Sequence, residues 1–408
     1  MSEWRIVDEF PPAPSAAESA FMPVKPIDAN ATGSTLPVDV SATGPTRPAV
    51  ILVAPGLGSG HAERFKSDRH RVDCRDREPV PWEIDLLRCL GLQGADERYA
   101  AGNIPAAHLL YALDRAAGAV TDVPAAHVVL ADPVALTPGR DEANLLPSEA
   151  LALTEAEIEA LFTSANDWLE EDGHALLRST SGRNYLVGLD GSQLETPPTH
   201  ALARRDVGRH FPGSTDAAVW RRLMTEIQMH WHAHAVNEQR EAAGLPSVNG
   251  IWFWGGAVPV PEGPAADSVA VLADDDLALA LSQLQGASVL SARVESEAGN
   301  KSASTADACA VSALLESTEH DTLVIVDLAA YQAWLAGDAK LFEQNQARVA
   351  NDRIEPLVKA VADGKIRSFI LLSGDGHETR WLPAEPKGWL QRMRQVGVKL
   401  VKPYMNPA

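Results

Sequence analysis

Short, continuous runs of apolar residues are the feature that most constrains the fold of this chain. The first run, residues 47–54, reads RPAVILVA and ends at the turn PGLGSG. A strand buried on both faces has this composition, and such strands belong to parallel sheets. Later runs alternate with segments whose apolar residues recur at helical spacing. This alternation predicts an α/β fold with a doubly wound, mostly parallel sheet.

The later elements follow from the same two patterns. Further strands are predicted at Ala125–Pro133, Ile251–Trp254, Ser268–Ala273, Ser288–Val294, Thr322–Leu328, Ser368–Ser373 and Val398–Lys402. Helices are predicted within 82–120 and at Leu277–Leu284, Ala306–Leu315, Lys340–Ala362 and Lys387–Val396.

The character of the chain changes near residue 148. Thr154 followed by Glu157 is a capping box that predicts a helix at 155–170. A strand at Asn184–Leu189 and a long helix at about 217–243 follow. We therefore expect an inserted α+β domain at 148–245. The α/β core would comprise 47–147 and 246–405, and residues 1–46, rich in Pro, Ala, Ser and Thr, would form a loose N-terminal arm.

The composition excludes several classes of function. The formal net charge of −20 argues against nucleic acid and against an anionic membrane surface, because both need a basic face on the protein. The apolar runs are strand-sized, and the acidic N-terminus does not resemble a signal peptide. Three scattered cysteines form neither a disulfide framework nor a metal motif. We expect a cytoplasmic protein with reduced thiols.

Candidate chemistry lies just past the predicted strands, because parallel sheets bind ligands at their carboxyl ends. The residues there include Asp132, the acids 274–276, Asp327, and the pair Asp375 and His377. A metal hydrolase needs several converging Asp and His ligands, so this set is small.

Two other motifs point to chemistry only weakly. The glycines after residue 54 do not complete a dinucleotide-binding motif because His61 stands where glycine is required. His230 and His234 are spaced for zinc on a helix, but the sequence HWHAH lacks the glutamate of HExxH. A sharp turn and histidines packed at a domain junction are the simpler interpretations.

The segment HAHAVNEQREAAGLPSVNGIWFWGG, residues 232–256, resembles a motif of the archaeal-type cofactor-independent phosphoglycerate mutases, members of the alkaline phosphatase superfamily. With EIQMHWHAHAVN and ADPVAL (131–136), the chain is most similar to a bacterial offshoot, the RpfE-type regulatory proteins. The resemblance spans most of 47–400 and implies an alkaline-phosphatase-like core with an inserted domain. It retains a hinge formed by His234, Asn237, Arg240, Gly244, Pro246 and Asn249.

The chain departs from the mutases at the positions of their chemistry. Pro55 stands where the first metal-binding aspartate is expected, and VPWE (80–83) has no nucleophilic serine. Val326, Tyr331 and Leu335 stand where later metal ligands would be, and only Asp338 is kept. Asp375 and His377 are separated by an extra glycine. Without these ligands and the nucleophile, the resemblance implies a preserved fold rather than a preserved reaction.

The sequence therefore predicts a catalytically inert, phosphoglycerate-mutase-like protein that regulates or binds, uses no cofactor, and has a protein or a small anionic ligand as partner. One alternative is an active phosphomutase or phosphatase with a rearranged Mn²⁺ or Zn²⁺ site. Another is a sensor that binds an anion between core and insert through Arg240, although a junction salt bridge explains that arginine more simply. The ligand-binding candidates are Arg240, His234, Asn237, Asn249, Asp375, His377 and Asp327.

Overall fold

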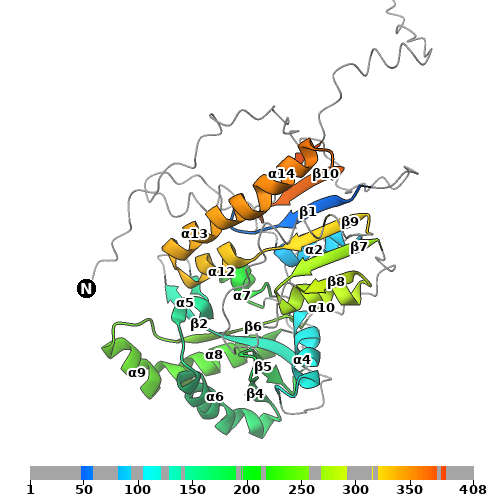
Figure 1. Ribbon diagram of the computed structural model, residues 1–408. Helices are drawn as coiled ribbons and strands as arrows, with labels where there is room; N and C mark the ends of the chain where they lie inside the picture. Colours follow the sequence, from blue (N-terminus) through cyan, green and yellow to red (C-terminus); the bar gives the residue numbers. More distant parts are fainter. Residues whose placement is uncertain are drawn as a thin grey trace, which may run out of the picture.

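The computed structural model describes two β-sheets with their helices (Figure 1). The described residues are 47–57, 81–92, 104–120, 128–138, 143–189, 194, 196–212, 217–256, 268–291, 315, 320–374 and 378–382. The predicted arm at 1–46, the helix at Lys387–Val396 and the strand at Val398–Lys402 lie outside these residues, as does all of the helix at Ala306–Leu315 except its last residue.

The larger sheet confirms the predicted mixed α/β fold with mostly parallel strands. Its order is β11-β10-β1-β9-β7-β8. The neighbouring pairs of β10, β1, β9, β7 and β8 are parallel, and only the edge strand β11 runs antiparallel. The bounds are β1 (Ala49–Val53), β7 (Val269–Ala273), β8 (Ser288–Ser291), β9 (Thr322–Val326), β10 (Ser368–Leu372) and β11 (Glu378–Trp381).

Both faces of this sheet are covered, which explains why β1 is apolar at every position. Ile51 and Val53 point into one hydrophobic core, whereas Val50 and Leu52 point into another. The first core includes residues of α2 (Trp82–Cys89), α4 (Ala106–Ala116), α10 (Asp276–Leu284) and α12 (Ala329–Ala336). The second includes residues of α13 (Ala339–Val349) and α14 (Glu355–Ala362). The sheet is therefore doubly wound, as the sequence predicts.

The second sheet corrects two strand assignments. The predicted strands at Ala125–Pro133 and Ile251–Trp254 form β2 (Val128–Pro138) and β6 (Gly250–Trp254), which pair antiparallel with each other and lie outside the parallel sheet. This sheet has the order β3-β2-β5-β4, with β6 on β2. The other bounds are β3 (Ala143–Leu146), β4 (Ala175–Arg178) and β5 (Asn184–Val187).

The physical reason for this error is burial. Seven of the eleven residues of β2 and all of β6 are buried, so their apolar runs look like those of a parallel strand. Strands from 128 to 254 thus share the second sheet, and the domain boundaries at 148 and 245 remain a prediction.

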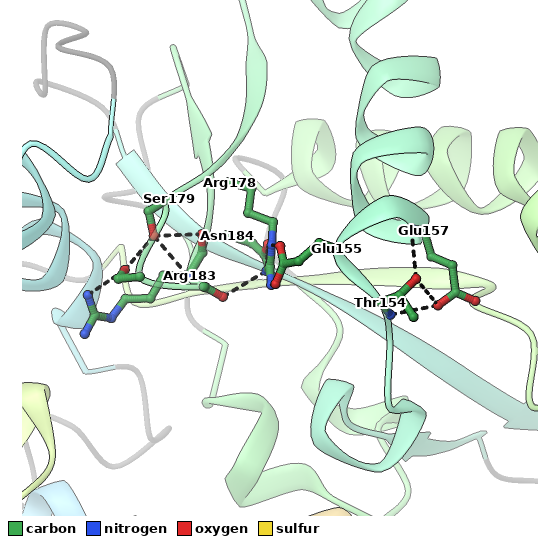
Figure 2. Close-up of polar contacts among 9 residues, drawn as sticks. Thr154, Glu155, Glu157, Arg178, Ser179, Arg183 and Asn184 are labelled. Carbon is green, nitrogen blue, oxygen red and sulfur yellow. Dashed lines mark hydrogen bonds and ion pairs between the residues drawn. The ribbon is translucent and has the colours of Figure 1, made fainter. Parts of the chain in front are cut away.

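Side-chain caps determine where two of the helices beside the second sheet begin. Thr154 caps α6 (Glu155–Leu169) through the predicted capping box, in which its hydroxyl accepts from Glu157 N–H and Glu157 accepts from Thr154 N–H (Figure 2). The predicted helix at 217–243 is instead two helices, α8 (Ala218–His232) and α9 (Ala235–Ala242). They separate because His234 accepts a hydrogen bond from Val236 N–H and caps α9. The shorter elements are α5 (Ser148–Leu151), η2 (Glu170–Asp172), α7 (Thr199–Leu202) and η3 (Gly208–His210).

The predicted helix at Lys340–Ala362 is also interrupted. A π-helical segment, η4 (Ala350–Ile354), lies between α13 and α14. Pro356 follows in the first turn of α14, where its missing N–H costs least. No helix among the described residues is long and apolar enough to cross a membrane.

Candidate functional site at the carboxyl edge of the parallel sheet

The carboxyl ends of β1, β9 and β7 meet at one edge of the parallel sheet. Asp327, directly after β9, donates its backbone N–H to the carbonyl of Val53 at 2.9 Å. Gly56 turns the chain after β1 with φ of +90°, which confirms the predicted sharp turn. In open α/β sheets ligands bind at this edge, so the side chains gathered there are the first candidates for a site.

On one side of the edge, Asp327 is held by two arginines. Nη2 of Arg348, from α13, donates to both carboxylate oxygens at 2.8 and 2.9 Å. Nε of Arg353, from the π-helical segment, lies 3.7 Å from Asp327 Oδ2. The Arg353 side chain is 4% exposed. This burial lowers the pKa of its guanidinium, and the negative charge of Asp327 offsets only part of the shift. Asp327 thus forms ion pairs with both Arg348 and Arg353.

On the other side, Glu83 and His200 form a buried ion pair. Glu83 lies in the first turn of α2 and is fully buried, and its Oε1 is 3.0 Å from Nε2 of His200 in α7. Within the described residues the Glu83 carboxylate has no hydrogen bond of good geometry. Burial alone would lower the pKa of His200, but the charge of Glu83 outweighs it and the pKa is raised. The imidazole therefore holds its proton more tightly than an exposed histidine.

Two further carboxyl groups lie within electrostatic reach of this pair. Asp275 follows β7 and caps α10 by accepting from Ala278 N–H at 2.9 Å. Burial, followed by the charge of Glu83, raises its pKa. Asp132 in β2 accepts from Thr199 and Trp254 at 2.7 Å each, and burial with the charge of Glu149 raises its pKa from 3.8 to about 6.

Chemically, this second group can hold and exchange protons in a desolvated setting at the junction of the two sheets. It has the composition of acid–base machinery, because burial and like charges raise the pKa values of Asp132 and Asp275. Across the described part of the chain, no three His, Cys, Asp or Glu side chains are grouped so that they could hold a metal ion.

The predicted ligand-binding residues of the hinge lie elsewhere and make internal contacts. Arg240 is 2% exposed; its guanidinium donates to the carbonyls of Pro246 and Leu151 at 2.8 and 2.7 Å and to Glu157 Oε1 at 2.8 Å. Asn237 donates to the carbonyls of Trp231 and Val248. These are the contacts of the junction salt bridge considered above, and a ligand role for Arg240 remains a prediction.

The other two hinge candidates, Asn249 and His234, also make internal hydrogen bonds. Asn249 exchanges two hydrogen bonds with the backbone of Leu136, at 2.6 and 2.9 Å, and so ties β6 to β2. His234 caps α9, as described above. His230 is exposed, so the prediction that it packs at a domain junction is wrong.

Of the strand-end candidates, Asp327 is the predicted ligand-binding residue that the structure places at the edge. Asp375 and His377 lie outside the described residues. Val326, Tyr331 and Leu335 are all buried, and Tyr331 donates its hydroxyl to the carbonyl of His200 at 2.7 Å. These positions, at which the sequence resemblance implies metal ligands, are here part of the packing. They do not fit a two-metal centre.

Four residues of the edge were not predicted from the sequence: Glu83, His200, Arg348 and Arg353. Glu83 and His200 are 117 positions apart and meet only through the folding of two sheets. In the sequence, both arginines fall in a segment with regular helical spacing, residues 340–362, which gives no sign of the π-helical segment. For Glu83, the one local signal was its place in the first turn of a helix that begins directly after Pro81.

Comparisons with known proteins return only distant likenesses. No family model matches the chain, and no curated protein does. Among solved structures, the PH0037 protein from Pyrococcus horikoshii is similar at a TM-score of 0.41 and 14% identity, over 83% of this chain and 87% of that one. A cofactor-independent phosphoglycerate mutase from Thermoplasma acidophilum is similar at a TM-score of 0.31 and 16% identity, over 83% of this chain and 90% of that one. One of these distant structural neighbours is thus a phosphoglycerate mutase, and similarity at this level assigns this chain no activity.

Proposed function

We propose that this chain is a phosphoglycerate-mutase-like protein that acts by binding and does not catalyse metal-dependent phosphoryl transfer. The regulatory role of RpfE-type proteins, which the sequence resemblance implies, is part of this proposal, as is an alkaline-phosphatase-like origin of the core.

The pairing of Asp327 with Arg348 and Arg353 is the observation that supports it best. A centre for two divalent cations gathers carboxylates and imidazoles, each with free oxygen or nitrogen lone pairs. At this edge both carboxylate oxygens of Asp327 accept hydrogen bonds from Arg348, and the guanidinium of Arg353 lies beside them. Cations already placed at the edge repel Mn²⁺ or Zn²⁺ and favour anions.

Metal analysis combined with a turnover assay tests this proposal. The purified full chain is incubated with Mn²⁺ or Zn²⁺, desalted, and measured for bound metal, and is then assayed with 3-phosphoglycerate and with p-nitrophenyl phosphate. We expect no retained metal and no turnover above buffer. Two bound metal ions per chain together with turnover would overturn the proposal.

A positive result would lead to the alternative of a rearranged Mn²⁺ or Zn²⁺ site. The variants Asp375→Asn and His377→Gln would then remove the activity, whereas Asp363→Asn, at an exposed helix end, would leave it intact.

A further inference from the structure

We propose that Arg348 and Arg353 form a binding site for a small oxyanion, such as phosphate or a phosphate ester, at the carboxyl edge of the parallel sheet. This inference rests on the proposed binding function and deepens it, because it names the class of ligand and the residues that contact it.

The first argument is the state of the Arg353 guanidinium. The side chain is 4% exposed, yet within the described residues its Nη1 has no hydrogen-bond partner, and its Nε has only the ion pair with Asp327 at 3.7 Å. Buried donors are almost always paired, and a charged donor left unpaired is costly, so an exception calls for a ligand or a water molecule. A guanidinium presents several donors in one plane, which matches the oxygens of phosphate or carboxylate.

The second argument is the balance of charge. Arg348 and Arg353 face one shared carboxylate, that of Asp327. The negative charge of Asp274 raises the pKa of Arg353 by a smaller amount than that of Asp327 does. The positive charge of Arg348 repels that of Arg353 and so lowers the pKa of Arg353 further. Two neighbouring guanidinium groups with one close counter-ion attract an additional anion.

The third argument is the backbone around Arg353. It belongs to the π-helical segment η4, which separates α13 from α14. π-Helical segments are rare and occur frequently at functional sites, because the wider turn redirects side chains. Arg353 in this segment lies beside Asp327 at the end of β9, the edge at which parallel sheets bind their ligands.

The alternative is that Arg353 serves only as a structural partner of Asp327, with water satisfying its other donors. The two interpretations differ in their response to phosphate. A structural arginine gains nothing from added phosphate, whereas a binding site is stabilised by mass action.

Thermal unfolding of the full chain in phosphate, against chloride at equal ionic strength, separates them. We expect phosphate to raise the Tm of the natural chain. In Arg353→Met the phosphate-dependent shift should disappear, while Asp327 keeps its partner Arg348. Arg222→Gln, which alters an exposed pair with Glu226 on α8, is the matched control and should keep the full shift.

Phosphate affinity measured by calorimetry adds a second readout. Arg353→Lys retains the charge but not the planar donor geometry, and we expect it to bind phosphate at least about ten-fold more weakly. This variant also serves if Arg353→Met fails to fold. Equal phosphate affinity in Arg353→Lys and the natural chain, or no phosphate effect on the natural chain, would overturn the inference.

The test is independent of that for the proposed function. If the chain binds phosphate through Arg353 and also turns over a phosphate ester, the inference stands and the proposed lack of catalysis fails. If it neither turns over substrate nor responds to phosphate, the proposed function stands and this site is refuted.

Discussion

At the scale of single residues, the surroundings of His200 are unusually well defined. Its ring packs edge-on against Trp254 and Tyr331, with centroids 5.8 and 6.0 Å away, and its Nε2 faces Glu83. Ring contacts on two sides fix the orientation of the imidazole. His200 comes from α7, Trp254 from β6 of the second sheet and Tyr331 from α12 beside the parallel sheet, so His200 lies where the two sheets meet.

Asp132 gives a pH-dependent prediction at this scale. Because its pKa is raised from 3.8 to about 6, the folded chain binds a proton that the unfolded chain has lost, and stability falls as the pH rises from about 4 to about 6. Asp132→Asn keeps an oxygen to accept from Thr199 and Trp254 but does not ionise. We expect it to be more stable than the natural chain at pH 7, by about 1–3 kcal/mol, with little difference at pH 4.

Urea unfolding between pH 4 and 7 measures this difference. The exposed residue Asp363 provides the control, since Asp363→Asn should keep the pH profile of the natural chain. An Asp132→Asn profile parallel to the natural one would show that Asp132 does not cause the pH dependence.

At the scale of elements, the hinge between α6, α9 and β6 depends on Arg240 and Glu157. Glu157 accepts from Thr154 in the capping box and from Arg240, while Arg240 also binds two carbonyls. One carboxylate thus fixes the start of α6 and its packing on α9.

We expect Arg240→Met to destabilise the fold by about 3 kcal/mol, because it leaves buried carbonyls and a carboxylate without their donor. Chemical denaturation followed by circular dichroism measures the loss. Arg222→Met, at an exposed position on α8, should change stability by less than about 0.5 kcal/mol. A loss equal in the two variants would contradict the structural role of Arg240.

The elements also show how far the sequence could predict the fold. The parallel strands β1, β7, β8, β9 and β10 and the helix α6 were predicted because continuous apolar runs and a capping box are local signals, whereas the antiparallel edge strand β11 was missed. The break before α9 was missed because histidine is an uncommon helix cap, and the π-helical segment because residues 340–362 keep helical spacing throughout. The partners of β2 and β6 could not be predicted, since both strands are buried and burial erases the alternation that separates antiparallel from parallel strands.

The site was less predictable than the fold for a related reason. Asp327 was identified by its place after a strand, which is again a local signal. Arg348 reaches it from the last turn of α13 and Arg353 from the π-helical segment η4, and Glu83 and His200 meet across two sheets. Such pairings depend on tertiary packing that no local pattern encodes.

At the scale of the whole molecule, Arg183 joins the second sheet to the helices of the parallel sheet. It lies just before β5 and forms ion pairs with Asp114 of α4 and Asp276 of α10. Asp114 is nearly fully buried and also accepts from Ser181 and from the Tyr185 hydroxyl at 2.8 Å. The ion pairs therefore connect three elements from distant parts of the chain (Figure 1).

We expect Arg183→Leu to cost about 3 kcal/mol, because it leaves the buried carboxylate of Asp114 without its cation. Since the lost contacts join the two sheets, differential scanning calorimetry should show two separated transitions where the natural chain shows one. Arg209→Leu, at an exposed position in η3, is the control and should retain a single transition. A single, unshifted transition in Arg183→Leu would show that other contacts couple the sheets.

The position of β1 in the parallel sheet has a consequence for how the chain is made. Both of its neighbours, β9 and β10, come from more than 260 residues further along the chain. A ribosome synthesises β1 before either neighbour, so this wholly apolar strand lacks β9 until residue 326 has emerged and β10 until residue 372, whereas every described strand of the second sheet is present by residue 254. Pairings of such long range form slowly and leave apolar strands exposed to aggregation. We therefore expect β1 to need protection by chaperones until both of its neighbours have been synthesised.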